Sequence, residues 1–326
     1  MVYRSSQQND TFIHIDGDVY IAALFPIHRS YNGGCGSINP QDGIERVVAA
    51  MFALDSVNDR LEKETGFRLG MLAKDTCYSN DRALEESLQF AQSRFKDESK
   101  FTYSDQCYSL LNGAAGNQTR NTVVGVIGPS TSEESMQVAT LLKLFKLPQI
   151  SYAATSPELS DKDVLPFFLR TVPSDYFQIQ VIFSIMTRFK WSYFSMIHED
   201  SNYGENGAAV IEENVRDANL CLGLKHRVSK RDSDKHLQIL VTEILQRNNT
   251  NGETIVVLYV SYDLAIRILR LIGKFGNGDN VRLIGVDAWI GRDIPSDKMV
   301  KRAVEGALGV TLMSTTMPSF KDFFKT

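Results

Sequence analysis

The residues best suited to chemistry in this 326-residue chain are small hydroxyl and acidic residues that follow apolar runs. One such segment, 130–134, lies directly after the apolar run 123–127 and begins a helical pattern. Thr131 and Glu134 have the spacing of a capping box. The amides and dipole of a helix N-terminus also suit an anion such as a carboxylate, although a plain helix cap explains this segment equally well. The segment 151–156 has the same form.

Catalytic and metal-binding patterns are sparse. The sequence has no GxGxxG after a strand, no GxxxxGK[ST] and no GxSxG. Its five histidines show no HExxH or comparable metal-ligand spacing. The nearest acid–base group is His198-Glu199-Asp200, for which solvated charges at a strand end are the favoured interpretation. We therefore expect no catalytic residues, no metal and no cofactor, with an α/β enzyme that uses His198 as the alternative.

The elements that must position these residues alternate along the chain. Strands are predicted at 19–25, 67–73, 123–127, 193–197, 254–260 and 281–286, with short ones near 150, 168 and 222. Helices are predicted at 44–60, 84–95, 133–145, 176–189, 205–217, 236–246 and 264–275. Strands that are apolar on both faces indicate parallel sheets covered by helices on both sides. A loop is predicted at 31–40, and the aperiodic polar segment 96–121 is too long for an ordinary connection.

The chain length predicts two domains, and the segment 171–174 is the favoured boundary. Two α/β lobes joined by a hinge place a ligand site in the cleft between them. The net charge of −4 makes nucleic acid a poor partner. No apolar run approaches the roughly 18 to 20 residues that span a bilayer, and the first ten residues lack a signal-peptide core.

Cysteines and glycosylation sequons bear on the compartment. The cysteines are Cys35, Cys77, Cys107 and Cys221. They form no CxxC pair, and taken alone they fit a cytosolic protein or two disulfides about equally well. Sequons occur at Asn9, Asn117 and Asn248. These candidate glycosylation sites favour an extracellular protein.

Longer segments carry a family resemblance. In chain order they are DGDVYIAALFPIH, CGSINPQDGIERVVAAMFALDSVN, VIGPSTSEESMQVATLLKLFKLPQISYAATSPELSDK, FLRTVPSD, WSYFSMIHEDSNYGENG and LIGVDAWIGRD. They cover nearly the whole chain and resemble the ligand-binding ectodomain of metabotropic glutamate receptors. The resemblance implies a two-lobed, periplasmic-binding-protein-like clamshell, in which each lobe is a parallel sheet flanked by helices. Lobe 1 is expected at 1–173 with 313–326 returning to it, and lobe 2 at 174–312.

The same resemblance implies a class C G-protein-coupled receptor on the extracellular side of the plasma membrane. Its ectodomain would bind an L-α-amino acid, glutamate or a relative, in the interlobe cleft and close to signal. A soluble amino-acid-binding or decoy protein of the same fold is the alternative.

Carried over position by position, the resemblance assigns the ends of the amino acid to particular residues. The α-carboxylate is expected at Ser132 and Thr155, with backbone amides beside Ala153. The α-ammonium is expected to meet Asp175 and Asp287, with a hydroxyl from Thr155. Both carboxylate-binding segments lie at predicted strand-to-helix turns, which present hydrogen-bond donors.

The resemblance assigns further residues to the side chain of the ligand. The resemblance implies that Tyr203 covers the ligand from lobe 2, and its ring face also attracts the cation. Arg46 and Arg292 are expected to hold the side-chain carboxylate of glutamate. Asp42, however, stands where the family usually has a tyrosine or a basic residue. Asp42 and Arg46 are i, i+4 neighbours and can pair, which would weaken glutamate binding; the alternative is that Asp42 points to solvent and Arg46 binds glutamate as in the family.

The resemblance also implies covalent bonds and partners. Cys35 is expected to bond with Cys77, and Cys107 to link the subunits of a homodimer. Cys221 is expected to be unpaired, because its family partner lies in a cysteine-rich segment beyond Thr326. The family also has a further distal lysine and seven membrane helices there, so we expect a truncated chain. A G protein would couple only through that missing membrane region.

Overall fold

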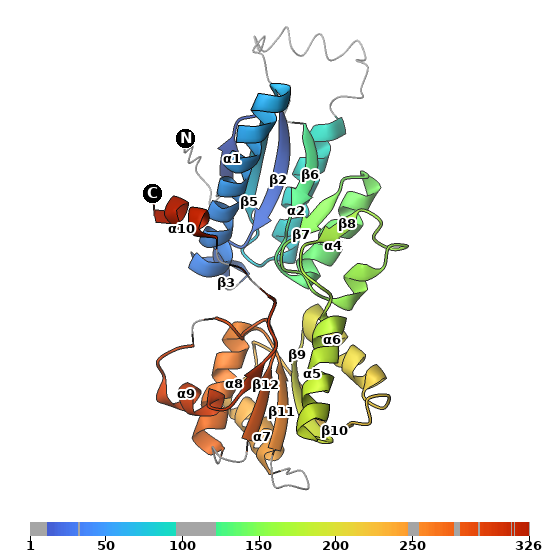
Figure 1. Ribbon diagram of the computed structural model, residues 1–326, viewed down its shortest axis with the longest axis vertical. Helices are drawn as coiled ribbons and strands as arrows, with labels where there is room; N and C mark the ends of the chain where they lie inside the picture. The colour runs from blue at the N-terminus through green and yellow to red at the C-terminus, as the bar shows by residue number, and fades with distance from the viewer. Residues whose placement is uncertain are drawn as a thin grey trace. The chain divides into compact units, whose positions relative to one another are not determined.

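A computed structural model describes residues 12–31, 33–95, 122–246, 254–276, 281–292, 294–313, 315 and 317–325. The expected sequons at Asn9, Asn117 and Asn248, the segment 96–121 and Cys107 lie outside these residues. The chain divides into two compact units, each with its own sheet (Figure 1). Unit 1 comprises Met1–Ala154, Asp161–Val172 and Thr316–Thr326, and unit 2 comprises Thr155–Ser160 and Pro173–Thr315. The predicted α/β fold class is confirmed.

Unit 1 is built on a six-stranded sheet with the strand order β1-β5-β2-β6-β7-β8. Its strands are β1 (Phe12–Ile15), β2 (Val19–Phe25), β5 (Leu69–Asp75), β6 (Val123–Ile127), β7 (Gln149–Ser151) and β8 (Phe168–Arg170). Its helices are the π-helical turn η1 (Pro40–Ile44), α1 (Glu45–Thr65), α2 (Asn80–Phe95), α4 (Ser132–Leu144) and α10 (Pro318–Lys325). Every strand pair is parallel except β1 with β5. The carboxyl ends of β6 and β7 therefore meet at one edge of the sheet.

Successive residues of β2 show how both faces of this sheet are covered. Ala22 and Leu24 belong to a core cluster with residues of α2 and α4. Ala23 and Phe25 belong to a second cluster with residues of α1. Because side chains alternate across a strand, the two clusters lie on opposite faces. Figure 1 shows α1 on one side of the sheet, with α2 and α4 on the other.

Two parts of unit 1 differ from the sequence prediction. The segment predicted as a loop at 31–40 contains an antiparallel ribbon of β3 (His28–Tyr31) and β4 (Gly34–Ile38). The turn between them contains Gly33 with φ +79°, a conformation that glycine adopts without steric cost. Glycines and polar residues dominate β4, so no apolar alternation marks it as a strand. The edge strand β1 was also missed.

Unit 2 is built on a five-stranded parallel sheet with the order β10-β9-β11-β12-β13. Its strands are β9 (Tyr193–Glu199), β10 (Cys221–Val228), β11 (Thr254–Tyr259), β12 (Val281–Gly285) and β13 (Leu308–Gly309). Its helices are the 3-10 turn η2 (Pro157–Ser160), α5 (Asp175–Phe189), α6 (Asn202–Asn214), α7 (Asp234–Leu245), α8 (Tyr262–Phe275) and α9 (Lys298–Val304). All six residues of β11 are buried, so helices cover both faces of the sheet.

No helix in the described part of the chain combines the length and the apolarity that crossing a bilayer requires.

Candidate functional site

In unit 1 the predicted carboxylate-binding segments follow adjacent strands, β6 and β7. Thr131 caps α4: its Oγ1 accepts the amide of Glu134 at 3.1 Å, and the Glu134 carboxylate accepts the Thr131 hydroxyl at 2.9 Å. The predicted capping box is therefore present. Glu134 is buried, which raises the pKa of its carboxyl, while hydrogen bonds from Thr131 oppose the shift. Ser132, the first residue of α4, is 5% exposed.

A shared acceptor holds the two segments together. The carbonyl oxygen of Pro129 accepts hydrogen bonds from Ser135 Oγ at 3.2 Å and from Ser151 Oγ at 2.9 Å. Ser151 Oγ in turn accepts the amide of Ala154 at 3.0 Å and, at a longer 3.4 Å, that of Ala153. These bonds orient the amides that follow β7. Unit 1 thus brings Ala153 and Ser132 to neighbouring strand ends, where the N-terminus of α4 favours an anion.

Arg46 lies beside the same strand end and is already paired. Its Nη2 donates to Oδ1 of Asp42 at 3.1 Å, so the expected ion pair is present. The guanidinium also lies over the ring of Tyr152, 4.8 Å from the ring centroid. The Tyr152 hydroxyl donates to the carbonyl of Leu24 at 3.0 Å, and its ring stacks on Phe25. A residue adjacent to Ala153 therefore supports Arg46.

The burial of the Asp42–Arg46 pair decides how freely Arg46 can turn to a ligand. The Asp42 side chain is 13% exposed and the Arg46 side chain 30% exposed. Removing one partner of a fully buried ion pair costs about 3 to 5 kcal/mol, because the other charge is left buried and uncompensated, and the partial exposure of Arg46 places this pair toward the lower end. A charge-assisted hydrogen bond to a ligand carboxylate returns about 1.5 to 3 kcal/mol. Moving Arg46 from Asp42 to a ligand is therefore unfavourable.

In unit 2 the residues expected near the ammonium form a buried cluster of acids and tyrosines. Asp175 is the first residue of α5, and its amide donates to the carbonyl of Thr155 at 2.9 Å. Both side chains are almost fully buried. Tyr203 on α6 stacks on Tyr259 at the end of β11, with ring centroids 4.7 Å apart. The Tyr203 hydroxyl donates to Oδ1 of Asp287 at 3.3 Å.

The electrostatics of this cluster favour a cation. Burial raises the pKa of Tyr259 well above its usual value, and the negative charges of Asp175 and Asp287 raise it further. Burial also raises the pKa of the Asp287 carboxyl, while hydrogen bonds from Gln178 and Tyr203 and the charge of Arg292 oppose the shift. Two carboxylates held in a partly dry cluster are stabilised by an added positive charge. The stacked tyrosines add ring faces that attract a cation.

Arg292 follows β12 and lies over the ring of Tyr262, 5.7 Å from its centroid. Burial raises the pKa of Asp287, and the charge of Arg292 opposes that rise, which places its positive field near that carboxylate. Within unit 2, Arg292 is thus engaged by groups of its own unit.

Three residues that sequence reasoning did not single out take part in these arrangements. They are Tyr152, Gln178 and Tyr259. Tyr152 and Tyr259 are aromatic residues at the carboxyl end of a strand, a signal that the sequence does contain. Gln178 lies one turn after Asp175 on the predicted helix, but a glutamine on a helix carries no distinguishing pattern.

Two residues of the candidate acid–base group His198-Glu199-Asp200 are buried, whereas the sequence predicted solvated charges. His198 and Glu199 are almost fully buried, so the interpretation as solvated strand-end charges was wrong for these two residues. Their strand β9 lies inside the sheet between β10 and β11, which removes both from water. Burial lowers the pKa of His198, although the nearby Glu205 opposes the shift. Glu199 accepts the amide of Ser261 at 2.6 Å and is held by Lys230.

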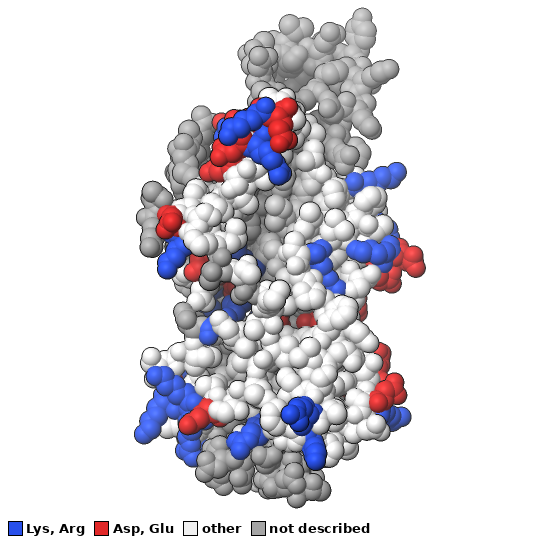
Figure 2. All heavy atoms as spheres, viewed as in Figure 1, with Lys and Arg blue, Asp and Glu red and all other residues white. Residues whose placement is uncertain are grey.

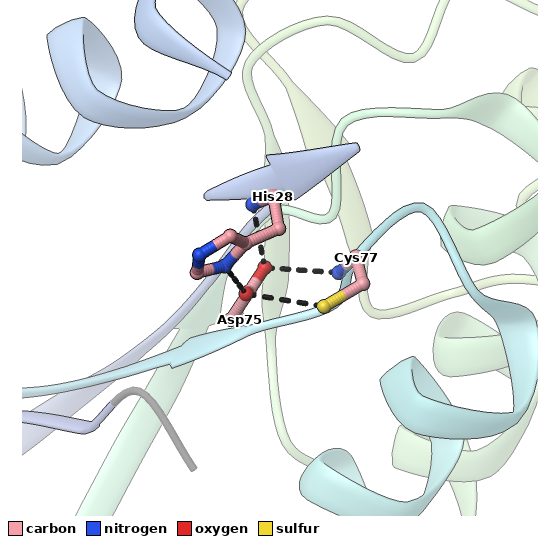
Figure 3. A group of neighbouring side chains, drawn as sticks. All are labelled: His28, Asp75 and Cys77. Carbon is pink, nitrogen blue, oxygen red and sulfur yellow. Dashed lines mark hydrogen bonds and ion pairs between the residues drawn. The ribbon is translucent and has the colours of Figure 1, made fainter. Parts of the chain in front are cut away.

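Within the described ranges, one group of side chains has metal-ligand spacing: His28, Asp75 and Cys77 (Figure 3). Cys77 forms a disulfide with Cys35, as the resemblance implied, so it has no thiolate to coordinate a metal. Asp75 accepts His28 Nδ1 at 2.6 Å and the amide of Ile27 at 2.8 Å. The Cys77 sulfur lies 3.1 Å from Asp75 but carries no proton to donate. We interpret this group as a set of structural contacts that hold β5 against the β3–β4 ribbon.

Cys221, the other cysteine in the described part of the chain, is exposed and free.

Unit 2 also has a surface hollow of about 690 Å³ on α9, lined by Lys298, Lys301, Arg302, Val304 and Glu305. Figure 2 shows Lys and Arg side chains gathered on this edge of unit 2. None of the candidate ligand-binding residues lines the hollow, so its chemistry is separate from theirs.

Comparisons with known proteins agree with the resemblance read from the sequence. The family described as receptor family ligand binding region matches residues 45–326. A probable metabotropic glutamate receptor, mgl-1, of Caenorhabditis elegans is 34% identical over 325 residues, which cover 96% of this chain and 32% of the relative. Metabotropic glutamate receptor 8 of Homo sapiens is 31% identical over 324 residues, which cover 98% of this chain and 35% of that receptor. Metabotropic glutamate receptor 4 of Rattus norvegicus is 31% identical over 315 residues, which cover 96% of this chain and 34% of that receptor.

The chain spans about a third of the length of these curated relatives. Each of them is a receptor by name. The resemblance to metabotropic glutamate receptors is confirmed, and the chain belongs to the family of receptor ligand-binding regions.

Proposed function

We propose that this chain is the extracellular ligand-binding region of a class C G-protein-coupled receptor and binds an L-α-amino acid between its two units. The observation that carries the proposal is the opposite chemistry of the two sets of site residues. Unit 1 offers the N-terminus of α4 at Ser132, next to the segment that contains Ala153, which Ser151 orients by accepting the amides of Ala153 and Ala154. Unit 2 offers Asp175 and Asp287 with two stacked tyrosines. An α-amino acid carries one carboxylate and one ammonium, which match these two sets.

Contact of the ligand with both units would link its binding to signalling. A ligand that contacts both units binds the closed arrangement better than the open one and shifts the population toward it. In a whole receptor at the plasma membrane, closure would act on a G protein through a membrane region. The proposed role is binding without turnover, which fits relatives that are receptors by name. Glutamate, which those names contain, is one candidate ligand.

A calorimetric screen of the common L-α-amino acids and their D-enantiomers tests the proposal. We expect saturable binding of at least one L-α-amino acid with no change in its concentration afterwards. We expect the matching D-enantiomer to bind at least tenfold more weakly, because it cannot place its carboxylate, ammonium and side chain at the same three positions. Failure of every L-α-amino acid to bind, or consumption of one, would contradict the proposal.

Dimerisation is the second part of this proposed function. We propose that Cys107, which lies outside the described residues, links two copies of the chain. Non-reducing electrophoresis of the secreted protein should show a dimer that becomes a monomer in Cys107→Ser. The matched control Cys221→Ser should leave the dimer intact, since Cys221 is the exposed free cysteine of unit 2. A wild-type monomer would contradict a disulfide-linked dimer.

A further inference from the structure

We infer that the site selects an L-α-amino acid with an uncharged side chain, and that Asp42 is the residue that excludes a second carboxylate. The inference rests on the proposed function and names its ligand class. Its basis is a set of contacts inside each unit that engage both expected distal cations, Arg46 and Arg292.

The backbone of η1 fixes Asp42. Gly43, the next residue, packs so closely on the chain after β2 that an added Cβ would lie 2.6 Å from the carbonyl oxygen of Pro26 and 2.7 Å from Cα of Ile27. Asp42 is itself 9% exposed. The backbone of the turn therefore has little room to carry Asp42 away from Arg46 when a ligand approaches. A negative charge remains at this position whether or not the site is occupied.

The neighbours of Arg46 hold its guanidinium in place. Asp42 binds it at 3.1 Å, and the ring of Tyr152 lies beneath it at 4.8 Å. Tyr152 is anchored by its hydroxyl bond to Leu24 and by stacking on Phe25. Arg46 thus keeps N–H donors beside the segment that contains Ala153, but its positive charge is compensated.

A compensated guanidinium distinguishes ligands by charge. A neutral amide or hydroxyl can accept a hydrogen bond from Arg46 without disturbing the pair. A carboxylate either repels Asp42 or takes Arg46 from it and leaves a buried charge alone. In unit 2, Arg292 lies over Tyr262, and its field acts on Asp287. Arg46 therefore offers no uncompensated charge to a second carboxylate, and the charge of Arg292 already acts on Asp287.

Matched acid and amide pairs test the inference directly. Calorimetry should compare glutamate with glutamine, and aspartate with asparagine, on the wild-type chain. We expect each amide to bind at least tenfold more tightly than its acid. In Asp42→Asn, which keeps the shape and removes the charge, glutamate affinity should rise at least tenfold and glutamine affinity should change less than threefold.

The control is Glu62→Gln, which removes the partner of an exposed ion pair with Arg68 near the end of α1. It should leave both affinities unchanged. Tighter binding of glutamate than glutamine by the wild type would overturn the inference, and so would equal glutamate affinities in wild type and Asp42→Asn. Those outcomes leave amino-acid binding intact. Binding of no L-α-amino acid to either protein would instead overturn the proposed function and this inference together.

Discussion

The residues proposed to bind the ligand differ between unit 1 and unit 2 in the charge that they suit and in the groups that supply it. Unit 1 orients backbone amides at the ends of β6 and β7, and a hydrogen-bonded carbonyl, that of Pro129, ties the two segments together. Unit 2 uses side chains: Asp175, Tyr203, Tyr259 and Asp287 come from or follow four different elements. An anion site made of backbone amides depends on the backbone conformation at the strand ends, whereas a cation site made of side chains depends on the identity of each residue. Substitutions should therefore affect ligand binding more in unit 2.

The largest effect is expected where unit 2 supplies charge. Thr155→Ala with Asp175→Ala should reduce amino-acid affinity by about 3 to 6 kcal/mol, because each change removes a charge-assisted bond worth about 1.5 to 3 kcal/mol. Calorimetry with an L-α-amino acid that binds the wild type measures the loss. In unit 1, Ser132→Ala should cost less, since the amides remain. Equal losses in the two units would break the contrast, and unchanged affinity in the double variant would remove both residues from the site.

A smaller effect is expected from crowding the tyrosine stack. A Cβ at Gly207 on α6 would lie 2.3 Å from a ring carbon of Tyr259, so Gly207→Ala must displace that ring or the helix. Overpacking of this kind costs about 1 to 3 kcal/mol of unfolding free energy. Urea unfolding measures it. The control Gly125→Ala, in unit 1, adds a Cβ at an ordinary 3.5 Å from Pro148 and should cost much less.

The helix cap of unit 1 gives the third prediction. Thr131→Ala removes the hydroxyl that caps the amide of Glu134, and it should lower the unfolding free energy by about 1 kcal/mol. Thr140→Ala, on the exposed face of the same helix, is the matched control. Equal changes in the two variants would show that the cap contributes little to the stability of α4. Amino-acid affinity should also fall in Thr131→Ala if this helix N-terminus binds the carboxylate.

The smallest expected effect is a pH dependence of the unfolding free energy, caused by Asp287 in unit 2. Burial raises the pKa of Asp287 above its usual 3.8, so the folded state holds this proton to higher pH than the unfolded state does. The stability that Asp287 contributes is therefore present at low pH and is lost as the pH rises through the raised folded value. The unfolding free energy of wild type minus that of Asp287→Asn should decline with pH across that window and then level off. A difference that rises with pH would contradict a raised pKa.

Short-range patterns explain the successful part of the sequence prediction. The apolar runs at β2 and β11 and the amphipathic pattern of α8 mark these elements without knowledge of their neighbours. Predicted boundaries differ from the observed ones by a few residues, as for the helix predicted at 205–217 and observed at Asn202–Asn214. The ribbon of β3 and β4 was missed because its glycines and polar residues show no alternation.

The sequence alone determined what depends on neighbours along the chain. The capping box of Thr131 and the ion pair of Asp42 with Arg46 both follow from a spacing of three or four residues within one helical segment. Such pairs can be inferred locally because helix geometry dictates which side chains are adjacent. The same holds for the alternation of strands and helices.

Only the tertiary structure decided which distant residues meet. The sheet order placed β9 between β10 and β11, which buried His198 and Glu199 against expectation. Packing of α6 near β11 set Tyr203 on Tyr259, and the strand order put Tyr152 under Arg46. Burial and ring contacts depend on long-range packing that no local spacing encodes. That packing adds the ring of Tyr152 to the local ion pair with Asp42, and so it decides how firmly Arg46 is held.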